Sequence, residues 1–217
     1  MLITKLEYQK RDPNRVNLYL EGKFFCGISL DTLAKEALYE GLNIEEEVLD
    51  RIVKEELKAR FLSRALEYIS KSPKTEFQIK KYLKELKFKK KNIWYKEGIE
   101  IDWESMIDSI VLKLKELKYI DDENFARMFV QSRMRIKPRG KNVMISELIS
   151  KGVSKDTAQM VCDEEVEDEY ELLKKTFRKK YKGKKLDTKD SKMVGFLYRK
   201  GFSWDLIEKL SNDDTEE

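Results

Sequence analysis

The segment Leu148-Ile149-Ser150-Lys151-Gly152-Val153-Ser154 returns in altered form as Leu197-Tyr198-Arg199-Lys200-Gly201-Phe202-Ser203. Met144 and Met193 each precede the glycine of their copy by eight residues. In both copies the Gly is placed to end one helix in the left-handed conformation, and the Ser is placed to cap the next helix. Self-similarity at a period of about 50 residues is typical of stacked helical repeats. Such an array offers a long surface rather than a pocket, which favours a long partner over a small substrate.

The N-terminal residues show a different pattern. Residues 2–28 alternate apolar and polar side chains around turn signals at Asp12-Pro13-Asn14 and Glu21-Gly22, which predicts three short antiparallel strands. A short helix is predicted from Ser29 to Tyr39, before Gly41. Residues 45–70 carry an apolar residue at every fourth position, which predicts one long helix.

We therefore expect a mainly α protein with three tandem three-helix repeats and an N-terminal antiparallel β module. The predicted organisation is a β module with a short helix at 1–44, a linking helix and first repeat at 45–120 with an insertion at 88–103, a second repeat at 121–166, a third repeat at 167–211 and an acidic tail at 212–217.

Local signals support these boundaries. Thr75 and Gln78 form a predicted capping box. Asp121 and Asp122 invite a metal or acid–base interpretation, but we expect them to cap a helix and favour its positive end. The 88–103 insertion has the alternation of a small hairpin. Its aromatic residues predict a local apolar core, with a partner anchor as the alternative: Trp94, Tyr95 and Trp103.

Composition argues against an enzyme and against a cofactor. The 217 residues include no His, the commonest general base and metal ligand. Cys26 and Cys162 are too few for a zinc site or a disulfide framework, so we expect two buried apolar residues and a reducing cytoplasmic location. No apolar run approaches the length of a membrane span, so we expect no membrane partner. We also expect a monomer. A hydrolase using carboxylates and a divalent metal is the third hypothesis we weigh.

Charge is nearly balanced overall, with 45 Lys and Arg against 41 Asp and Glu, but it is unevenly distributed. Three basic clusters are candidates for a partner or DNA surface, and each has a solvated helix face as its alternative. We favour the cluster at 127–141, since arginine forms planar forks to phosphate or carboxylate. Phe177 and Tyr181, inside the cluster at 174–185, are expected to be core residues. The candidates are Arg127, Arg133, Arg135, Lys137, Arg139 and Lys141 in the first cluster, Lys174, Lys175, Arg178, Lys179 and Lys182 in the second, and Lys80, Lys81 and Lys84 in the third.

The chain resembles the RecX family, the bacterial regulators of the recombinase RecA. The resemblance is carried by Tyr119-Ile120-Asp121-Asp122-Glu123-Asn124-Phe125-Ala126, then Arg133 and Gly140, then Glu147-Leu148-x-x-Lys151-Gly152-Val153. It extends over residues 57–210, and the N-terminal strands resemble an extension present in part of the family. The first repeat departs from the pattern, because it is Lys-rich where an Arg-rich segment is expected.

The resemblance implies a non-enzymatic protein that binds the RecA filament on DNA along its helical groove. It also implies that the protein restrains ATP hydrolysis, strand exchange and co-protease activity of the recombinase. The alternative is a general nucleic-acid-binding helical repeat protein with no recombinase partner. The regulator would contact single- or double-stranded DNA weakly, through electrostatic attraction, whereas the alternative predicts tight binding of DNA or RNA alone, with a steep dependence on salt.

Overall fold

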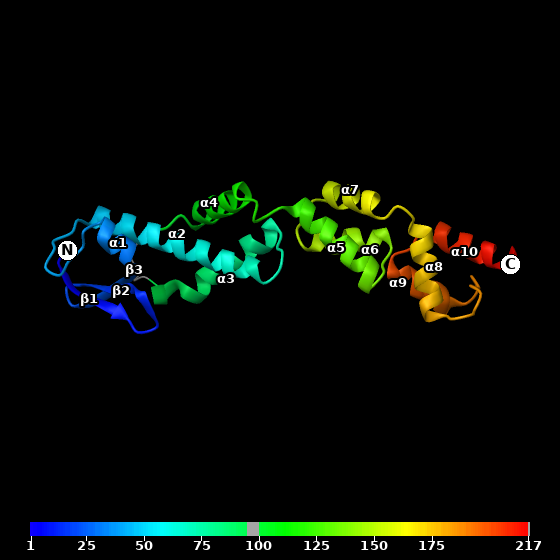
Figure 1. Ribbon diagram of the computed structural model, residues 1–217, viewed down its shortest axis with the longest axis horizontal. Coiled ribbons are helices and arrows are strands. Elements are labelled where there is room, and N and C mark those ends of the chain that lie inside the picture. Colours follow the sequence, from blue (N-terminus) through cyan, green and yellow to red (C-terminus); the bar gives the residue numbers. More distant parts are fainter. Residues whose placement is uncertain (95–99, 217) are drawn as a thin grey trace. The chain divides into compact units, whose positions relative to one another are not determined.

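The computed structural model describes residues 1–94 and 100–216, without the side chains of residues 90–93 and 214–216. Three strands are followed, in the described part, by ten helices (Figure 1). The predicted fold class, mainly helical with an N-terminal antiparallel sheet, is confirmed. No helix among the described residues is long and apolar enough to cross a membrane.

The chain divides into two compact units. Unit 1 comprises residues 1–72 and 79–119, and unit 2 comprises residues 73–78 and 120–217.

The sheet of unit 1 consists of β1 (Ile3–Gln9), β2 (Asp12–Leu20) and β3 (Lys23–Ser29), antiparallel and in that order. Alternate residues of β2 are buried, which gives the sheet one apolar face. The β2–β3 turn at Glu21-Gly22 is where predicted, and both residues have positive φ, as a tight hairpin requires. The first turn was wrongly placed: it lies at residues 10–11, and Pro13 belongs to β2.

Pro13 fits in a strand because it precedes the first β2–β3 pair, Arg15 with Ser29, so no hydrogen bond to β3 is lost. The helix predicted to reach Tyr39 is also shorter than expected, since α1 spans Leu30–Lys35. Ala37 has a φ of 47° and closes the helix, while Leu38 N donates to Leu33 O at 3.0 Å. This is the hydrogen-bond pattern of a Schellman motif with Ala in place of Gly, so the sequence carried no glycine signal there.

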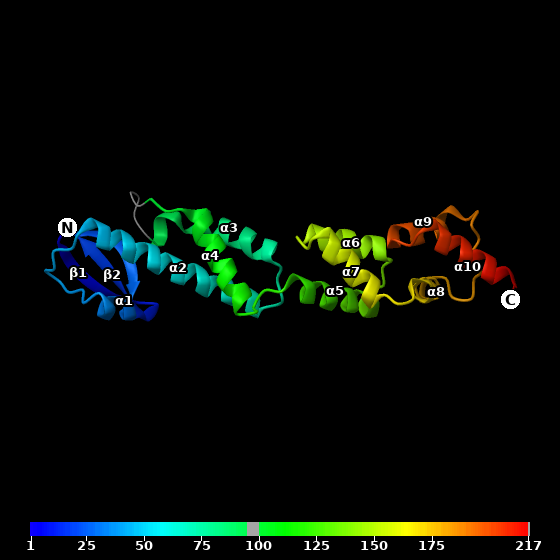
Figure 2. The same ribbon diagram turned by 90° about the horizontal axis from the view of Figure 1, so that it is seen from above.

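The long helix α2 (Glu46–Ser70) has the predicted length and apolar face, with Val53, Leu57, Phe61 and Ala65 buried. It runs from the sheet past the other helices of unit 1 (Figures 1 and 2).

Those other helices are α3 (Glu76–Trp94), whose residues from 79 onward belong to unit 1, and α4 (Trp103–Glu116). Trp94 and Trp103 pack on Phe61 with ring centroids 5.7 and 5.5 Å away, which confirms the predicted apolar core for these two residues. Residues 88–94 continue α3 and do not form a hairpin, while residues 95–99, including Tyr95, lie outside the described part.

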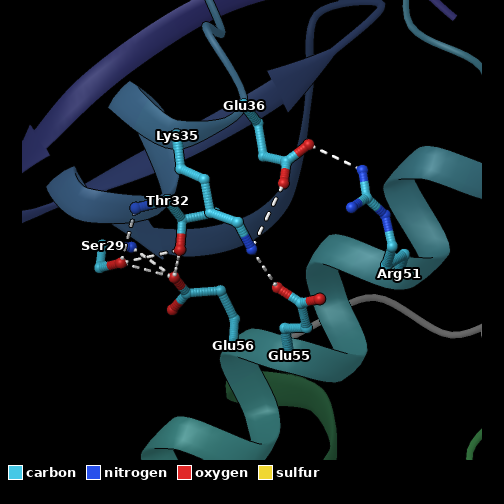
Figure 3. Close-up of polar contacts among 7 residues, drawn as sticks. All are labelled: Ser29, Thr32, Lys35, Glu36, Arg51, Glu55 and Glu56. Atoms are coloured by element: carbon cyan, nitrogen blue, oxygen red, sulfur yellow. Dashed lines mark hydrogen bonds and ion pairs between the residues drawn. The ribbon is translucent and has the colours of Figure 1, made fainter.

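A buried carboxylate joins the sheet to α2. Glu56 is 5% exposed, and its Oε1 accepts hydrogen bonds from Ser29 N at 2.9 Å, Ser29 Oγ at 2.7 Å and the Thr32 hydroxyl (Figure 3). Its Oε2 pairs with Arg15 Nη2 at 2.6 Å. An outer layer of exposed pairs surrounds this group, including Lys35 with Glu55 at 3.2 Å (Figure 3). Glu56 therefore connects β2, the β3–α1 corner and α2.

Unit 2 contains α5 (Asp122–Ile136), α6 (Lys141–Ser150), α7 (Lys155–Glu165), α8 (Glu169–Lys180), α9 (Ser191–Lys200) and α10 (Trp204–Glu216). These helices share one apolar cluster. Matching residues of the two copies are buried in it, Met144 with Met193 and Leu148 with Leu197. Cys162 is buried in the same cluster, and Cys26 is buried in unit 1. Burial raises their thiol pKa values to about 11 and about 12, so both are unreactive, as expected of core residues.

The duplicated segment forms the same turn twice. Gly152 and Gly201 both have a φ of 91°, as predicted. Val153 N donates to Leu148 O, and Phe202 N donates to Leu197 O. These are Schellman motifs, in which an apolar residue after the glycine packs near the helix end. Leu, Gly and the following apolar residue therefore recur because one turn needs all three.

Each of these turns meets the start of a helix from the preceding repeat. At the end of α6, the carbonyl of Lys151 accepts from Thr75 Oγ1 at 2.5 Å, just before α3. At the end of α9, the carbonyl of Lys200 accepts from Gly140 N at 2.7 Å, just before α6. In unit 2 the C-terminus of α9 thus faces the N-terminus of α6, an arrangement that aligns their dipoles favourably.

The adjacent carboxylates Asp121 and Asp122 cap helices of two different repeats. Asp121 caps its own helix through Asn124 N at 2.9 Å, as predicted, whereas Asp122 accepts from Glu76 N at the start of α3, at 2.8 Å. The next repeat does the same: Asp168 caps α8, and Glu169 accepts from Lys141 N at the start of α6, at 2.7 Å. The predicted capping box is present too, with Gln78 N donating to Thr75 Oγ1.

Substituting Ala for Gly152 or Gly201 should lower the free energy of unfolding by about 2–4 kcal/mol, because strain at positive φ adds to steric overlap. A Cβ at 152 would overlap the Phe77 side chain, and one at 201 would lie 2.6 Å from Val143 Cγ2. Gly183 is the matched control, since its φ is 70° but its surroundings are open, so Gly183→Ala should cost about 1 kcal/mol. Equal losses in urea denaturation for all three variants would contradict the close approach between repeats.

Substituting Gln for Glu56 should cost about 3 kcal/mol at neutral pH, since Arg15 would keep a buried charge without its carboxylate. Burial disfavours the ionised Glu56, but hydrogen bonds from Thr32 and Ser29 outweigh it and lower its pKa below the ordinary value of 4.5. The ionised form therefore adds stability above about pH 5, and this is lost as pH falls through the folded-state pKa.

Urea denaturation of the wild type and of Glu56→Gln should therefore differ less at about pH 3.5 than at pH 7. Glu55→Gln is the control, because it removes an exposed ion pair on the same helix and should cost less than about 1 kcal/mol. A pH-independent difference would contradict the role assigned to the ionised Glu56.

Candidate functional site

Five cations converge in unit 2 where the second and third repeats meet. Lys137 and Arg139 lie between α5 and α6, Lys179 and Lys180 lie at the end of α8, and Lys200 ends α9. Partial burial lowers the pKa of Lys200 below its usual value, and the positive charges of the other four lower it further. The structure thus unites parts of the basic clusters at 127–141 and 174–185. We call these five residues the joint patch.

Backbone contacts hold the joint patch together. Gly140 N donates to Lys200 O at 2.7 Å, and Arg139 Nη1 lies 3.5 Å from Arg199 O. A Cβ at position 140 would lie 2.5 Å from the carbonyl carbon of Gly201, closer than real Cβ contacts. Only glycine allows the α5–α6 loop to reach the end of α9, so Gly140 is the residue that brings the two clusters together.

An aromatic ring supports two of the lysines of the patch, Lys180 and Lys200. Lys180 Nζ lies 3.9 Å from the centroid of the Phe196 ring, and Lys200 Nζ lies 5.5 Å from it. Tyr181 packs edge-on against Phe196 at 5.7 Å and, with its ring tilted by 33°, against Phe177 at 5.2 Å. Phe177 and Tyr181 are therefore packing residues, as predicted. Cation–π contacts of this kind contribute about 0.5–1 kcal/mol each and keep the ammonium groups near the surface.

The joint patch carries positive charge that nearby carboxylates do not neutralise. Lys137, Lys179 and Lys180 are exposed, and within the described ranges none of them forms an ion pair. Arg139 Nε is buried without a hydrogen-bond partner in the same part of the chain. Clustered like charges raise the local potential and attract a polyanion or an acidic protein surface. The chemistry suited to this site is binding.

Other predicted residues of the 127–141 cluster are engaged within the second repeat. Arg127 pairs with three carboxylates that raise its pKa, those of Glu123, Glu164 and Glu165, at 2.8, 2.6 and 3.2 Å. It links α5 to the end of α7. Arg133 pairs with Glu147 at 2.8 Å and lies over the Phe129 ring at 4.9 Å, and Lys141 pairs with Asp163 at 2.9 Å.

The remaining predicted residues differ in their surroundings. Arg135, Lys175, Arg178 and Lys182 are exposed in unit 2, and Lys81 is exposed in unit 1. Three other lysines have acidic neighbours, Lys174 with Glu171 at 3.0 Å, Lys80 with Asp108 at 2.9 Å and Lys84 with Glu104 at 3.9 Å.

Sequence reasoning used Lys200 only as part of the repeat and missed it as a site residue. A usable signal was present, because Arg199 and Lys200 are consecutive cations in the last turn of a helix that ends at Gly201. Lys151, the equivalent of Lys200 in the second repeat, likewise lies over an aromatic ring, that of Phe129 at 5.6 Å. A cation before the glycine is thus a feature of both turns.

Substituting Gln for Lys200 relieves repulsion within the patch but also removes the cation–π contact with Phe196, so at low ionic strength the free energy of unfolding should change by less than about 0.5 kcal/mol. At about 0.5 M salt, where the repulsion is screened, the variant should be about 0.3–0.5 kcal/mol less stable than the wild type. Lys189→Gln, at an exposed position outside the patch, is the control and should show no such dependence on salt. A salt-independent effect of Lys200→Gln in thermal denaturation would contradict mutual repulsion in the patch.

Three family models match the chain. They are the regulatory protein RecX N-terminal domain at residues 1–45, the second RecX three-helix domain at 121–161 and the third at 167–210.

Relatives match over most of the chain. It is 32% identical to the regulatory protein RecX of Leuconostoc mesenteroides, over 95% of this chain and 73% of that protein. It is 30% identical to regulatory protein RecX of Clostridium perfringens, over 98% and 97% of the two chains. A crystal structure of regulatory protein RecX superposes with a TM-score of 0.65 at 26% identity, covering 97% of this chain and 98% of that one. RecX from Lactobacillus salivarius gives a TM-score of 0.54 at 25% identity, over 74% and 97% of the two chains. The chain belongs to the RecX family of regulatory proteins.

Proposed function

We propose that this protein binds the RecA recombinase filament on DNA along its helical groove. Bound there, it reduces ATP hydrolysis, strand exchange and co-protease activity. The observation that carries the proposal is the joint patch, a group of uncompensated cations in a member of a regulatory family. The joint patch contains no catalytic group, so the proposed regulation acts through binding.

Two features of the joint patch suit a nucleoprotein filament: its positive charge and the contacts that hold the charged segments in place. A nucleoprotein filament presents repeated phosphates and acidic side chains, which attract a fixed cluster of cations without requiring a particular base sequence. A backbone hydrogen bond from Gly140 to Lys200 joins the two segments of the patch, and Lys180 and Lys200 share the Phe196 ring. Such preorganisation reduces the entropy lost on binding.

The patch is also costly to the fold. Burial lowers the pKa of Lys200 and the positive charges facing it lower it further, so repulsion among these charges opposes stability. Groups that oppose stability are most readily explained by function. By the same reasoning, Arg127 and Arg133 support the fold, since both pair with carboxylates inside the second repeat.

Uncompensated lysines also fit bare DNA, which keeps a general nucleic-acid-binding protein as the second candidate. The two functions differ in stoichiometry. A filament regulator lowers recombinase ATP hydrolysis at concentrations well below those that coat the DNA, whereas a competitor for DNA acts only when it saturates the strand.

The test is the ATP hydrolysis of RecA on single-stranded DNA, titrated with the wild type and with a triple variant of the patch, Lys137→Gln, Lys179→Gln and Lys180→Gln. Each lost cation should remove about 0.5 kcal/mol of binding energy, so half-inhibition should require about tenfold more of the variant. The matched control removes three exposed lysines of unit 2 outside the patch, through Lys155→Gln, Lys189→Gln and Lys192→Gln.

The control variant should inhibit within about twofold of the wild type. Equal weakening by both variants would show that net charge alone matters and would remove the patch from the site. Inhibition by the wild type only at DNA-saturating levels would overturn the filament as the target and favour the second candidate.

A further inference from the structure

Unit 1 contains a cleft between the sheet and α2 that the joint patch does not involve. Its volume is about 680 Å³, and its lining comes from the β1–β2 turn, β2, β3, α2 and the end of α3. Asp12 contributes an acidic group to the lining. Four guanidinium groups and two aromatic rings define its chemistry, those of Arg11, Arg15, Arg60, Arg64, Phe24 and Trp94.

The arginines of this cleft are only partly neutralised. Arg15 Nη2 donates to Glu56 and to Gly27 O, yet its Nε is buried with no hydrogen-bond partner among the residues described. Arg60 has no carboxylate within ion-pair distance in that same set. Burial, which is the main cause, and the charge of Arg15 together lower the pKa of Arg60 to about 10. Two cations thus share a partly dry site, an arrangement that an anionic ligand would relieve.

The backbone of β3 allows two side chains of the cleft to approach it closely. A Cβ at Gly27 would lie 2.9 Å from Arg60 Nη2 and 2.5 Å from Gln9 Nε2. Glycine at this position therefore lets both side chains lie against the strand. Gln9 is itself held by Asn17 at 2.8 Å, so the floor of the cleft is polar and ordered.

Aromatic rings flank the cations. The Arg60 guanidinium lies 5.2 Å from the Trp94 ring centroid, and Phe24, which also lines the cleft, is 37% exposed. Guanidinium groups form paired hydrogen bonds to phosphate oxygens, and aromatic faces stack on bases. The combination suits a flexible strand, whose bases are free to turn toward a ring. A duplex keeps its bases stacked inside.

We propose that this cleft binds the phosphodiester backbone of single-stranded nucleic acid. Arg15 and Arg60 contact a phosphate, Arg11 contacts a neighbouring phosphate, and one base stacks on Phe24 or Trp94. The N-terminal module is thereby a strand-binding element separate from the joint patch. The proposal does not depend on a recombinase partner.

The test measures binding of a fluorescein-labelled oligothymidylate of about ten residues by anisotropy, without recombinase and at low salt. All proteins carry the triple variant of the joint patch, so that the second basic surface contributes little. Arg60→Gln and Arg11→Gln should each weaken binding about tenfold, the loss expected for one charged hydrogen-bonding group. Arg11 is exposed with no ion pair in the part of the chain that is described, so its loss leaves the fold intact.

Lys58→Gln is the matched control, since it removes an exposed charge from α2 outside the cleft and should change affinity less than about twofold. Quenching of tryptophan fluorescence by the oligomer should be smaller in Trp94→Phe than in its parent. Equal weakening by all three charge variants would overturn the cleft as the site. Competition by inorganic phosphate or thymidine monophosphate as strong as that of unlabelled oligomer would overturn a strand in favour of a free anion.

Discussion

The left-handed glycine that ends α6 and α9 is the constraint on which unit 2 depends. At Gly152 and Gly201 the chain reverses within one residue, which exposes the last helix carbonyls to the start of another helix. Any side chain at these glycines would intrude on Phe77 or Val143. The close contact between repeats therefore depends on the absence of a Cβ atom at these two glycines. The apolar residue after each glycine packs the same turn against the core.

Capping across repeats makes neighbouring repeats depend on each other. The first turn of α6 receives its acceptors from the third repeat, namely Glu169 and the carbonyl of Lys200. The start of α3 likewise receives acceptors from the Asp122 carboxylate and the carbonyl of Lys151. The N-terminus of α9 is capped locally by Asp190. Unpaired helix-end groups are costly when buried, so each repeat completes its neighbour.

The same joints concentrate charge. Because the end of α9 must meet the loop before α6, Lys200 is placed beside Arg139 and beside the lysines that end α8. In unit 1 the buried Glu56 fixes Arg15, and Arg15 shares a cleft with Arg60. In both units a packing requirement brings cations together at some cost to stability. Both arrangements are suited to an anionic partner, which would offset that cost.

Local signals in the sequence determined the secondary structure and the repeat. Glycine at positive φ, the Thr75–Gln78 box and the four-residue spacing along α2 act between near neighbours, so their effect can be read from the chain. The exceptions were also local: Ala37 closes α1 without a glycine, and Pro13 enters β2 ahead of its pairing with β3. Only the tertiary structure decided which charges are free. Arg127 finds Glu164 and Glu165, Asp122 caps a helix of another repeat, and Lys200 joins Lys179 and Lys180. Those contacts join residues far apart in sequence, and packing of the helices, which no local pattern encodes, sets the distances between them.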